Sequence, residues 1–262
     1  MKTAMKALIN KDLKAITKNK QLFASIIVVP LIMGVFLPLL FVVIFHFVPD
    51  EMGDLQPLLN LLPAKGIKDG QTMVLSLLIN YLMPGFFLMI PLMAASVMAA
   101  SAFVSEKEKS TLETLLLSPL SLREIFTAKV LSAFILSMLV SLATFLLMTL
   151  AFETAVYLLM GRLVALHFSW VLILLLVGPA VSLLAITLIV RTSAKSQTAM
   201  EAQQRSVFLI LPLLLLVIGQ LTGVMLLDAW MLLGLGIVLG AIAYVLMWGA
   251  VKKITYEKLM GI

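Results

Sequence analysis

Side chains that could do chemistry are few and widely separated in this chain. The absence of cysteine excludes disulfides, thiol catalysis and Cys-ligated metal sites. The two histidines, His46 and His167, stand far apart beside long apolar stretches, where an imidazole is more often an interfacial residue than a ligand. Within those stretches the strongest polar candidates are the amides of Asn80 and Gln220. We predict that both contribute polar contacts to a pathway through the apolar segments.

Residues 104–124, which separate two apolar stretches, hold the densest group of charged and hydroxyl side chains. Two Ser-x-x-Glu capping boxes compete for the start of a short helix, and only one can be real: Ser105 with Glu108, or Ser110 with Glu113. Three leucines follow at helical spacing and form an apolar stripe: Leu112, Leu115 and Leu116. Pro119 ends this helix, and Ser121 with Glu124 begins the next one by the same device.

An exposed leucine stripe on such a helix needs a partner surface. Charges of both signs precede the stripe: Glu106, Lys107, Glu108 and Lys109. Mixed charge favours the groove of a soluble protein over an anionic lipid surface. The alternative is a capped loop helix that packs on its own bundle.

The elements that position these residues are apolar helices. The chain is 62% hydrophobic and 12% charged, whereas a soluble domain carries roughly 25% charged residues. A membrane-spanning helix needs about 20 mostly apolar residues, and six stretches qualify. We therefore predict an all-α membrane protein, one domain over 1–262, with six transmembrane helices: about 22–48, 72–103, 125–152, 169–190, 207–227 and 229–250.

Two features of these spans are irregular. The fifth and sixth are separated by little more than Asp228, so one span plus a re-entrant hairpin within 207–250 is the alternative to two spans. The second stretch is longer than one crossing requires and contains Pro84 and Pro91. Each proline removes a backbone hydrogen bond and predicts a kink.

The distribution of basic residues predicts the orientation. Of the 19 Lys and Arg residues, all but Lys65, Lys68 and Arg162 fall in segments that an even number of spans places on one side. The positive-inside rule makes that side the cytoplasm, with both termini there. The net charge of +6 is then a topology signal whose nearest partner is anionic membrane lipid. We predict no nucleic-acid partner, and expect a multi-pass protein of a prokaryotic plasma membrane.

The first 21 residues form a separate element. On a helix over 2–20, five apolar residues share one arc: Met5, Leu8, Ile9, Leu13 and Ile16. Five polar residues occupy the opposite arc: Lys6, Asn10, Lys11, Lys14 and Lys18. This pattern predicts an amphipathic helix in the membrane interface before the first span, and the alternative is a plain basic anchor.

In two segments the sequence resembles the permeases of ABC-2-type ABC transporters. Residues 105–116 (SEKEKSTLETLL), followed by Pro119 and by 123–125 (REI), are similar to the family's E-(K/R)-E-(K/R)-G-T-L-E-x-L-L stretch and the Pro and R-E-I after it. Lys11-Asp12-Leu13, a basic stretch and an apolar helix containing Pro30 match the family's opening. The sodium- and drug-exporter-like subgroup is the nearest resemblance. Ser110 departs from the usual Gly, which a helix cap tolerates.

The resemblance implies a division of labour between this chain and a separate nucleotide-binding ATPase subunit. The 2–20 helix and the 105–117 helix, as a cytoplasmic coupling helix between spans 2 and 3, would contact that subunit. The implied ATPase-coupling residues are Glu106, Lys107, Glu108, Thr111, Leu112, Glu113, Leu115 and Leu116. The chain contains no G-x-x-x-x-G-K-(S/T), so we expect no cofactor on this chain, ATP and Mg²⁺ on the partner, and a second permease half, as a homodimer.

Two other classes of protein compete with this hypothesis. An ion-coupled secondary transporter or channel that needs no ATPase usually keeps charged residues inside its spans, and none stands mid-span here. A membrane-embedded enzyme would need convergent nucleophiles, acids or metal ligands, which two separated histidines do not supply. The weakly polar spans fit a lipid-like molecule, a drug or an amphipathic peptide better than a free ion as the cargo. Sodium stays an alternative cargo, because the family includes members that resemble sodium exporters.

Overall fold

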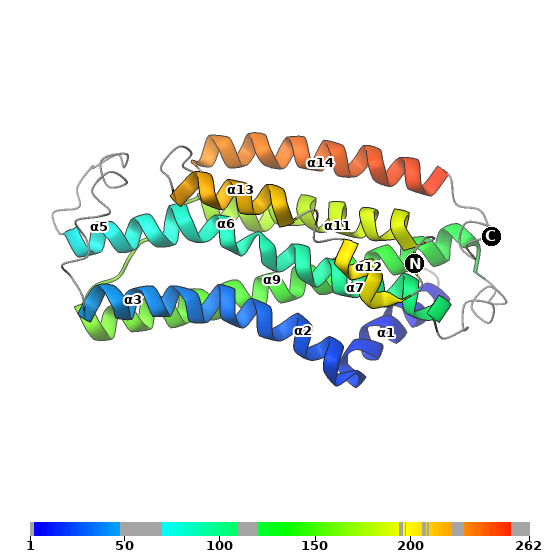
Figure 1. Ribbon diagram of the computed structural model, residues 1–262, viewed down its shortest axis with the longest axis horizontal. Coiled ribbons are helices and arrows are strands. Elements are labelled where there is room, and N and C mark those ends of the chain that lie inside the picture. The colour runs from blue at the N-terminus through cyan, green and yellow to red at the C-terminus, as the bar shows by residue number, and fades with distance from the viewer. Residues whose placement is uncertain are drawn as a thin grey trace.

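The computed structural model describes residues 3–47, 70–108, 120–193, 196, 198–205, 208, 210–221 and 228–252. Within these ranges the regular structure is entirely helical, as the all-α prediction requires (Figure 1). The coupling-helix residues Thr111, Leu112, Glu113, Leu115 and Leu116 lie outside the described residues.

Five helical segments of the described chain are long and apolar enough to cross a membrane. They are Leu22–Phe47, Thr72–Glu106, Leu122–Met160, Ser169–Ser193 and Ala229–Ala250. Five of the predicted spans overlap these segments, and the clearest error is at the Met160 end of the third. A polar break was expected from residue 153, but the helix continues to Met160.

The predicted fifth span is shorter than the others in the described residues. It contains α13 (Ile210–Leu221), which packs against α6 (Met83–Phe87), and an apolar helix of this length falls below the ~20 residues that a perpendicular crossing needs. Residues 222–227, which complete the predicted span, lie outside the described part of the chain. The count of six spans therefore stays a prediction.

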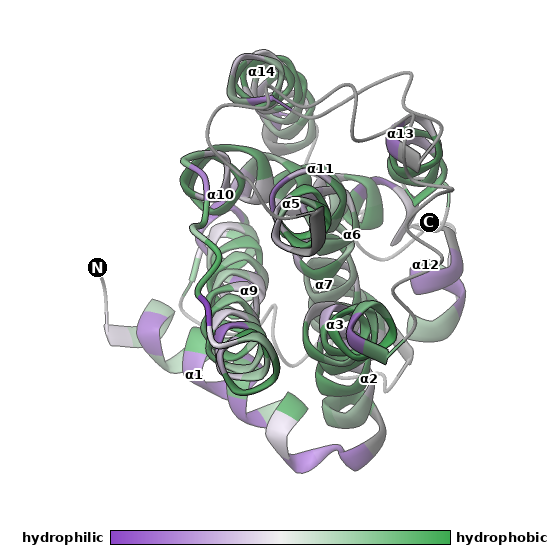
Figure 2. Ribbon diagram, turned by 90° about the vertical axis from the view of Figure 1, so that its left-hand side faces the viewer, coloured by the Kyte–Doolittle hydropathy of each residue, from purple (hydrophilic) through white to green (hydrophobic). Residues whose placement is uncertain are grey.

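The second span is the core of the bundle. It runs through α5 (Gly70–Leu77), α6 and α7 (Met89–Glu108), and most of its residues are buried. In the end-on view these helices stand in the middle (Figure 2), with α9 (Leu122–Met160) and α11 (Gly178–Ser193) packed against α7. The last span, α14 (Ala229–Lys252), packs against α11 and buries few of its side chains.

In the described part of the chain, three spans contain a widened, π-helical turn directly before a proline. These turns are η1 (Leu31–Phe36), η3 (Leu78–Leu82) and η4 (Ile173–Val177), and the prolines are Pro38, Pro84 and Pro179. In each case the residue before the proline donates its N–H to the carbonyl five residues back. A proline ring collides with the carbonyl four residues back, and a π turn moves that carbonyl away. The irregularity predicted at Pro84 is confirmed, and a break at Leu88 precedes Pro91.

The long helix α9 is defined by caps at both ends. Ser121 and Glu124 form the predicted capping box: Glu124 Oε2 accepts from the Ser121 N–H at 3.0 Å, and Ser121 Oγ accepts from the Glu124 N–H at 3.4 Å. At the other end Gly161 adopts a left-handed conformation with φ of 67°, which favours glycine. Ser105 does not start a helix, because it lies inside α7; that alternative is wrong.

Basic side chains of the described residues gather at one end of the bundle. That end contains α1 (Thr3–Lys18), the end of α7, the start of α9, α12 (Ala199–Arg205) and the end of α14 (Figure 1). Figure 2 shows hydrophilic residues on α1 and α12 and mainly hydrophobic residues on the spans. We call this the basic end; Arg162, which follows α9, lies at the opposite end.

Candidate functional site

The N-terminal helix α1 is joined to the bundle through its apolar arc. Leu8 and Ile9 are buried against Ile125 and Ala128 of α9, and Lys6, Asn10 and Lys14 are exposed, so the predicted amphipathic pattern is confirmed. Because α9 covers part of the apolar face, α1 is a packed element of the bundle and not a plain basic anchor.

An acidic residue occupies the middle of this apolar face. Asp12 lies one turn after Leu8 and one turn before Ile16, and only 6% of its surface is exposed. Ser132 Oγ of α9 donates to Asp12 Oδ2 at 3.3 Å. Burial raises the pKa of the Asp12 carboxyl above its usual range, with Glu106 adding to the rise, while Lys129, Lys11 and the Ser132 hydrogen bond oppose it.

Glu106, on the last turn of α7, joins two lysines from two other helices. Its Oε1 lies 2.8 Å from Lys11 Nζ of α1, and its Oε2 lies 2.7 Å from Lys129 Nζ of α9. Lys129 is only 3% exposed. It also donates to the Ala102 carbonyl, and its Nζ lies 5.8 Å from the centre of the Phe103 ring.

These four charged residues form one ionic junction: Lys11, Asp12, Glu106 and Lys129. The junction connects α1, α7 and α9 at the basic end, and its Glu106 belongs to the 105–116 stretch that carries the family-like motif. A buried ion pair holds its geometry because either charge alone would be left in a poorly solvating interior. A shift of α1 or of the end of α7 is therefore coupled to α9.

A cavity of about 220 Å³ lies beside the junction, between α1 and α7. Lys11, Asp12 and Ala15 line it from α1, and Met98 and Ser101 are among its residues on α7. α1 thus packs closely on α9 and leaves space toward α7, where the junction's charges span the gap.

Of the predicted coupling residues, the structure brings only Glu106 into this junction. Lys107 and Glu108 belong to the last residues of α7, and the remaining five lie outside the described residues. The leucine stripe therefore stays a prediction.

Asn80 lies in η3 and holds the connection over residues 161–168 in place. Its Nδ2 donates to the Ala165 carbonyl at 3.0 Å, and its Oδ1 accepts from the His167 N–H at 2.8 Å. The side chain is 1% exposed. Both ends of the amide thus bind the 161–168 connection.

Gln220 joins α13 to the second span. Its side chain is fully buried, and its Nε2 donates to the Tyr81 carbonyl. A Cβ on Gly85 would come within 2.3 Å of Gln220 Oε1, so glycine at this position admits the amide. The polar atoms of Asn80 and Gln220 face neighbouring segments here, and their place in a pathway stays a prediction.

Most mid-span hydroxyls of the described residues bond within their own helix. The donors Ser96, Ser137, Ser141, Thr144 and Thr187 each reach a backbone carbonyl three or four residues back at 2.7–2.8 Å. Among the described residues, no group of three His, Asp or Glu side chains could hold a metal ion. The described spans therefore offer little polar chemistry away from the junction.

Asp12 and Lys129 were not predicted from the sequence as site residues. Lys129 was counted only as a topology charge, although it lies on the same face of α9 as the buried residues Phe126, Ser132 and Ala133. Asp12 likewise falls at helical spacing among buried apolar positions of α1. A charged residue within an apolar stripe is the signal that could have predicted a buried ion pair.

This bundle of apolar helices with a buried ionic junction at one end defines a polytopic helical membrane protein. The sequence model of the family described as ABC-2 type transporter matches residues 3–219. The chain belongs to this family, as the resemblance implied, and is a permease component of an ABC transporter: a transport subunit and not itself the ATPase. A comparison with curated proteins finds no significant match.

Proposed function

We propose that this chain is one half of an ABC exporter, in which two copies form the pathway and a separate nucleotide-binding subunit, holding ATP and Mg²⁺, drives it. The observation that carries the proposal is the position of Glu106. It is paired with Lys11 of α1 and Lys129 of α9, and it is the first acidic residue of the 105–116 stretch, whose sequence resembles the family's coupling motif. The two predicted contact elements for the ATPase thus meet at one carboxylate.

Force from the ATPase would reach the spans through this junction. α9 is a continuous helix of 39 residues, about 58 Å long at 1.5 Å per residue. A displacement of α1 or of the 105–117 segment would tilt α9 as a unit because the ion pairs resist sliding. Such rigid-body motion is a common way to exchange inward- and outward-facing states.

The basic end is proposed to face the cytoplasm of a prokaryotic cell, with both termini there. The described Lys and Arg residues support this orientation under the positive-inside rule, and anionic headgroups would contact the exposed lysines of α1. In the described spans the charged side chains lie toward the helix ends. This distribution favours a lipid-like, drug-like or amphipathic cargo over an ion-coupled mechanism.

The test is to identify the ATPase and measure its coupling. A P-loop ATPase encoded by the neighbouring gene would be co-expressed with this chain, and the complex reconstituted in vesicles. We expect ATP hydrolysis to depend on both subunits and to respond to candidate lipids, drugs, peptides or sodium. Solute movement by the chain alone, driven by an ion gradient without ATP, would support the ion-coupled alternative instead.

A further inference from the structure

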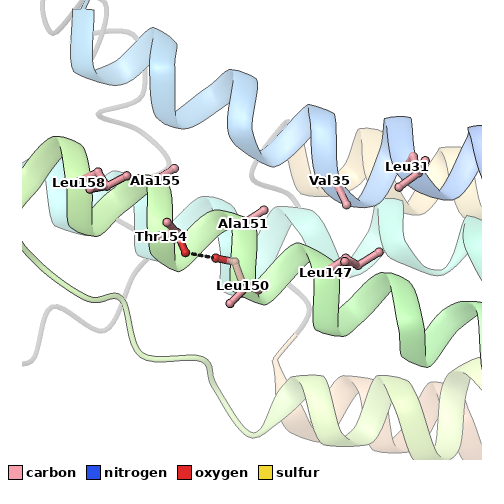
Figure 3. A pocket seen from close by; sticks show the side chains of 8 residues that line it. All are labelled: Leu31, Val35, Leu147, Leu150, Ala151, Thr154, Ala155 and Leu158. Carbon is pink, nitrogen blue, oxygen red and sulfur yellow. Dashed lines mark hydrogen bonds between the residues drawn. The ribbon is translucent and has the colours of Figure 1, made fainter.

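An apolar groove lies on the outside of the bundle between the first span and α9 (Figure 3). It has a volume of about 470 Å³. Leu31 and Val35 of η1 form one wall, and residues between Leu147 and Leu158 of α9 form the other. We call this the α9 groove.

The groove exists because small and large side chains alternate along α9. Ala151 and Ala155 stand one helical turn apart, on the same face, and leave a hollow. The larger side chains of Leu147, Leu150 and Leu158 border it and are 48%, 68% and 75% exposed. Apolar side chains so exposed require a hydrocarbon environment.

The lining offers no partner for a polar ligand. Its one polar side chain is Thr154, whose Oγ1 donates to the Leu150 carbonyl at 2.6 Å, shown as a dashed line in Figure 3. No charged side chain lines the groove. An occupant that carries hydrogen-bonding groups would have to bury them unpaired.

The length of the groove matches the thickness of one membrane leaflet. From Leu147 to Leu158 the helix axis covers about 16 Å at 1.5 Å per residue. Half of the ~30 Å hydrocarbon core is about 15 Å. Both walls belong to segments able to cross a membrane, and the groove ends just before α9 does at Met160.

We propose that the α9 groove binds an acyl chain of a phospholipid from the leaflet on the Met160 side. The chain lies along Ala151 and Ala155, between the leucines of α9 and Leu31 of η1. This site needs only the membrane-inserted bundle and holds whether or not an ATPase drives the protein.

The test places the full chain in vesicles of phosphatidylethanolamine and phosphatidylglycerol that contain a phosphatidylglycerol with a diazirine in its acyl chain. After irradiation, labelled peptides are mapped. In the wild type we expect label to concentrate on the groove residues of α9 and η1. In Ala151→Leu, and in Ala155→Leu, a leucine fills the hollow, and we expect groove label to fall about tenfold, equivalent to 1.4 kcal/mol of binding free energy.

The matched control is Ala143→Leu, the same substitution at an exposed position of α9 outside the groove; it should keep the wild-type label. Equal label along all exposed faces of α9, or unchanged groove label in both filled variants, would overturn the proposal. Loss of a dimer in the filled variants with unchanged label would assign the groove to a second copy instead. If either leucine variant fails to fold, Ala151→Val provides the same comparison with less added volume.

Discussion

Lys129 Nζ of α9 lies 2.7 Å from Glu106 Oε2 of α7, and both side chains are at least nine-tenths buried. Lys11 contacts the other oxygen of the same carboxylate from α1, but its side chain is 57% exposed. One carboxylate thus has an interior partner and a surface partner, and these two ion pairs should differ strongly in energy.

Replacing Lys129 by methionine should therefore destabilise the bundle far more than replacing Lys11 by methionine. Removing one member of a buried pair costs about 3–5 kcal/mol, whereas an exposed pair contributes about 0–1 kcal/mol. Thermal unfolding of the detergent-purified variants measures both, and Lys11→Met is the matched control. Adding Glu106→Gln should recover part of the Lys129→Met loss; equal melting temperatures for the two lysine variants would contradict the assignment.

Asp12→Asn should remove a pH-dependent cost of packing α1 on α9. The pKa of Asp12 is raised by burial, so the folded protein binds this proton more tightly than the unfolded chain. Stability is then lost as pH rises from the ordinary aspartate pKa of 3.8 through the raised folded pKa, and is regained on acidification. Asn keeps an oxygen for the Ser132 hydroxyl and carries no charge.

The measurement is the melting temperature of both proteins across this pH range. The difference between Asp12→Asn and wild type should be largest at the upper end and shrink toward acid. If the wild type instead gains stability relative to Asp12→Asn as pH rises, the attraction of the Asp12 carboxylate to Lys11 and Lys129 outweighs the cost of burying it.

Asn80→Ala should reduce stability by leaving the His167 N–H and the Ala165 carbonyl without their partner. An orphaned buried polar group costs about 1–3 kcal/mol. Thermal unfolding measures the loss, and transport by the surviving protein tests the pathway hypothesis. Unchanged stability combined with an altered cargo preference would place Asn80 in the pathway.

The sequence predicted the elements better than their contacts. Apolar runs predicted the positions of the five described long helices because hydrophobic length depends on local composition. The third span was predicted to end just before Glu153, but α9 continues past this residue to Met160. The Glu153 carboxylate is satisfied locally, because it accepts from the Val164 N–H at 3.2 Å. The ionic junction escaped prediction because its residues are 95 positions apart at Lys11 and Glu106, and pairings at such distance depend on how the helices pack.

Gly85→Ala should push α13 away from the second span. The added Cβ would meet Gln220 Oε1 at 2.3 Å and Val217 Cγ2 at 3.0 Å, and overpacking of this kind costs about 1–3 kcal/mol. Gln220→Ala removes the closer obstacle. The double variant should therefore lose less stability than the two single variants lose together. Strict additivity in this thermal-unfolding cycle would indicate that the two residues do not touch.

Glu108→Lys combined with Leu112→Asp should uncouple the chain from its ATPase. The first change reverses a charge before the predicted leucine stripe, and the second places a charge within it, so the predicted helix would lose its protein partner while the spans stay intact. We expect normal membrane insertion, loss of co-purification with the ATPase and loss of its stimulation. The matched control makes similar changes on α12 at the same end, Gln204→Lys with Met200→Asp, both at exposed positions. Retained ATPase binding and stimulation in the Glu108→Lys, Leu112→Asp variant would contradict the coupling role of the 105–117 segment. Loss of ATPase binding in both double variants would show that the whole basic end tolerates no such change of charge.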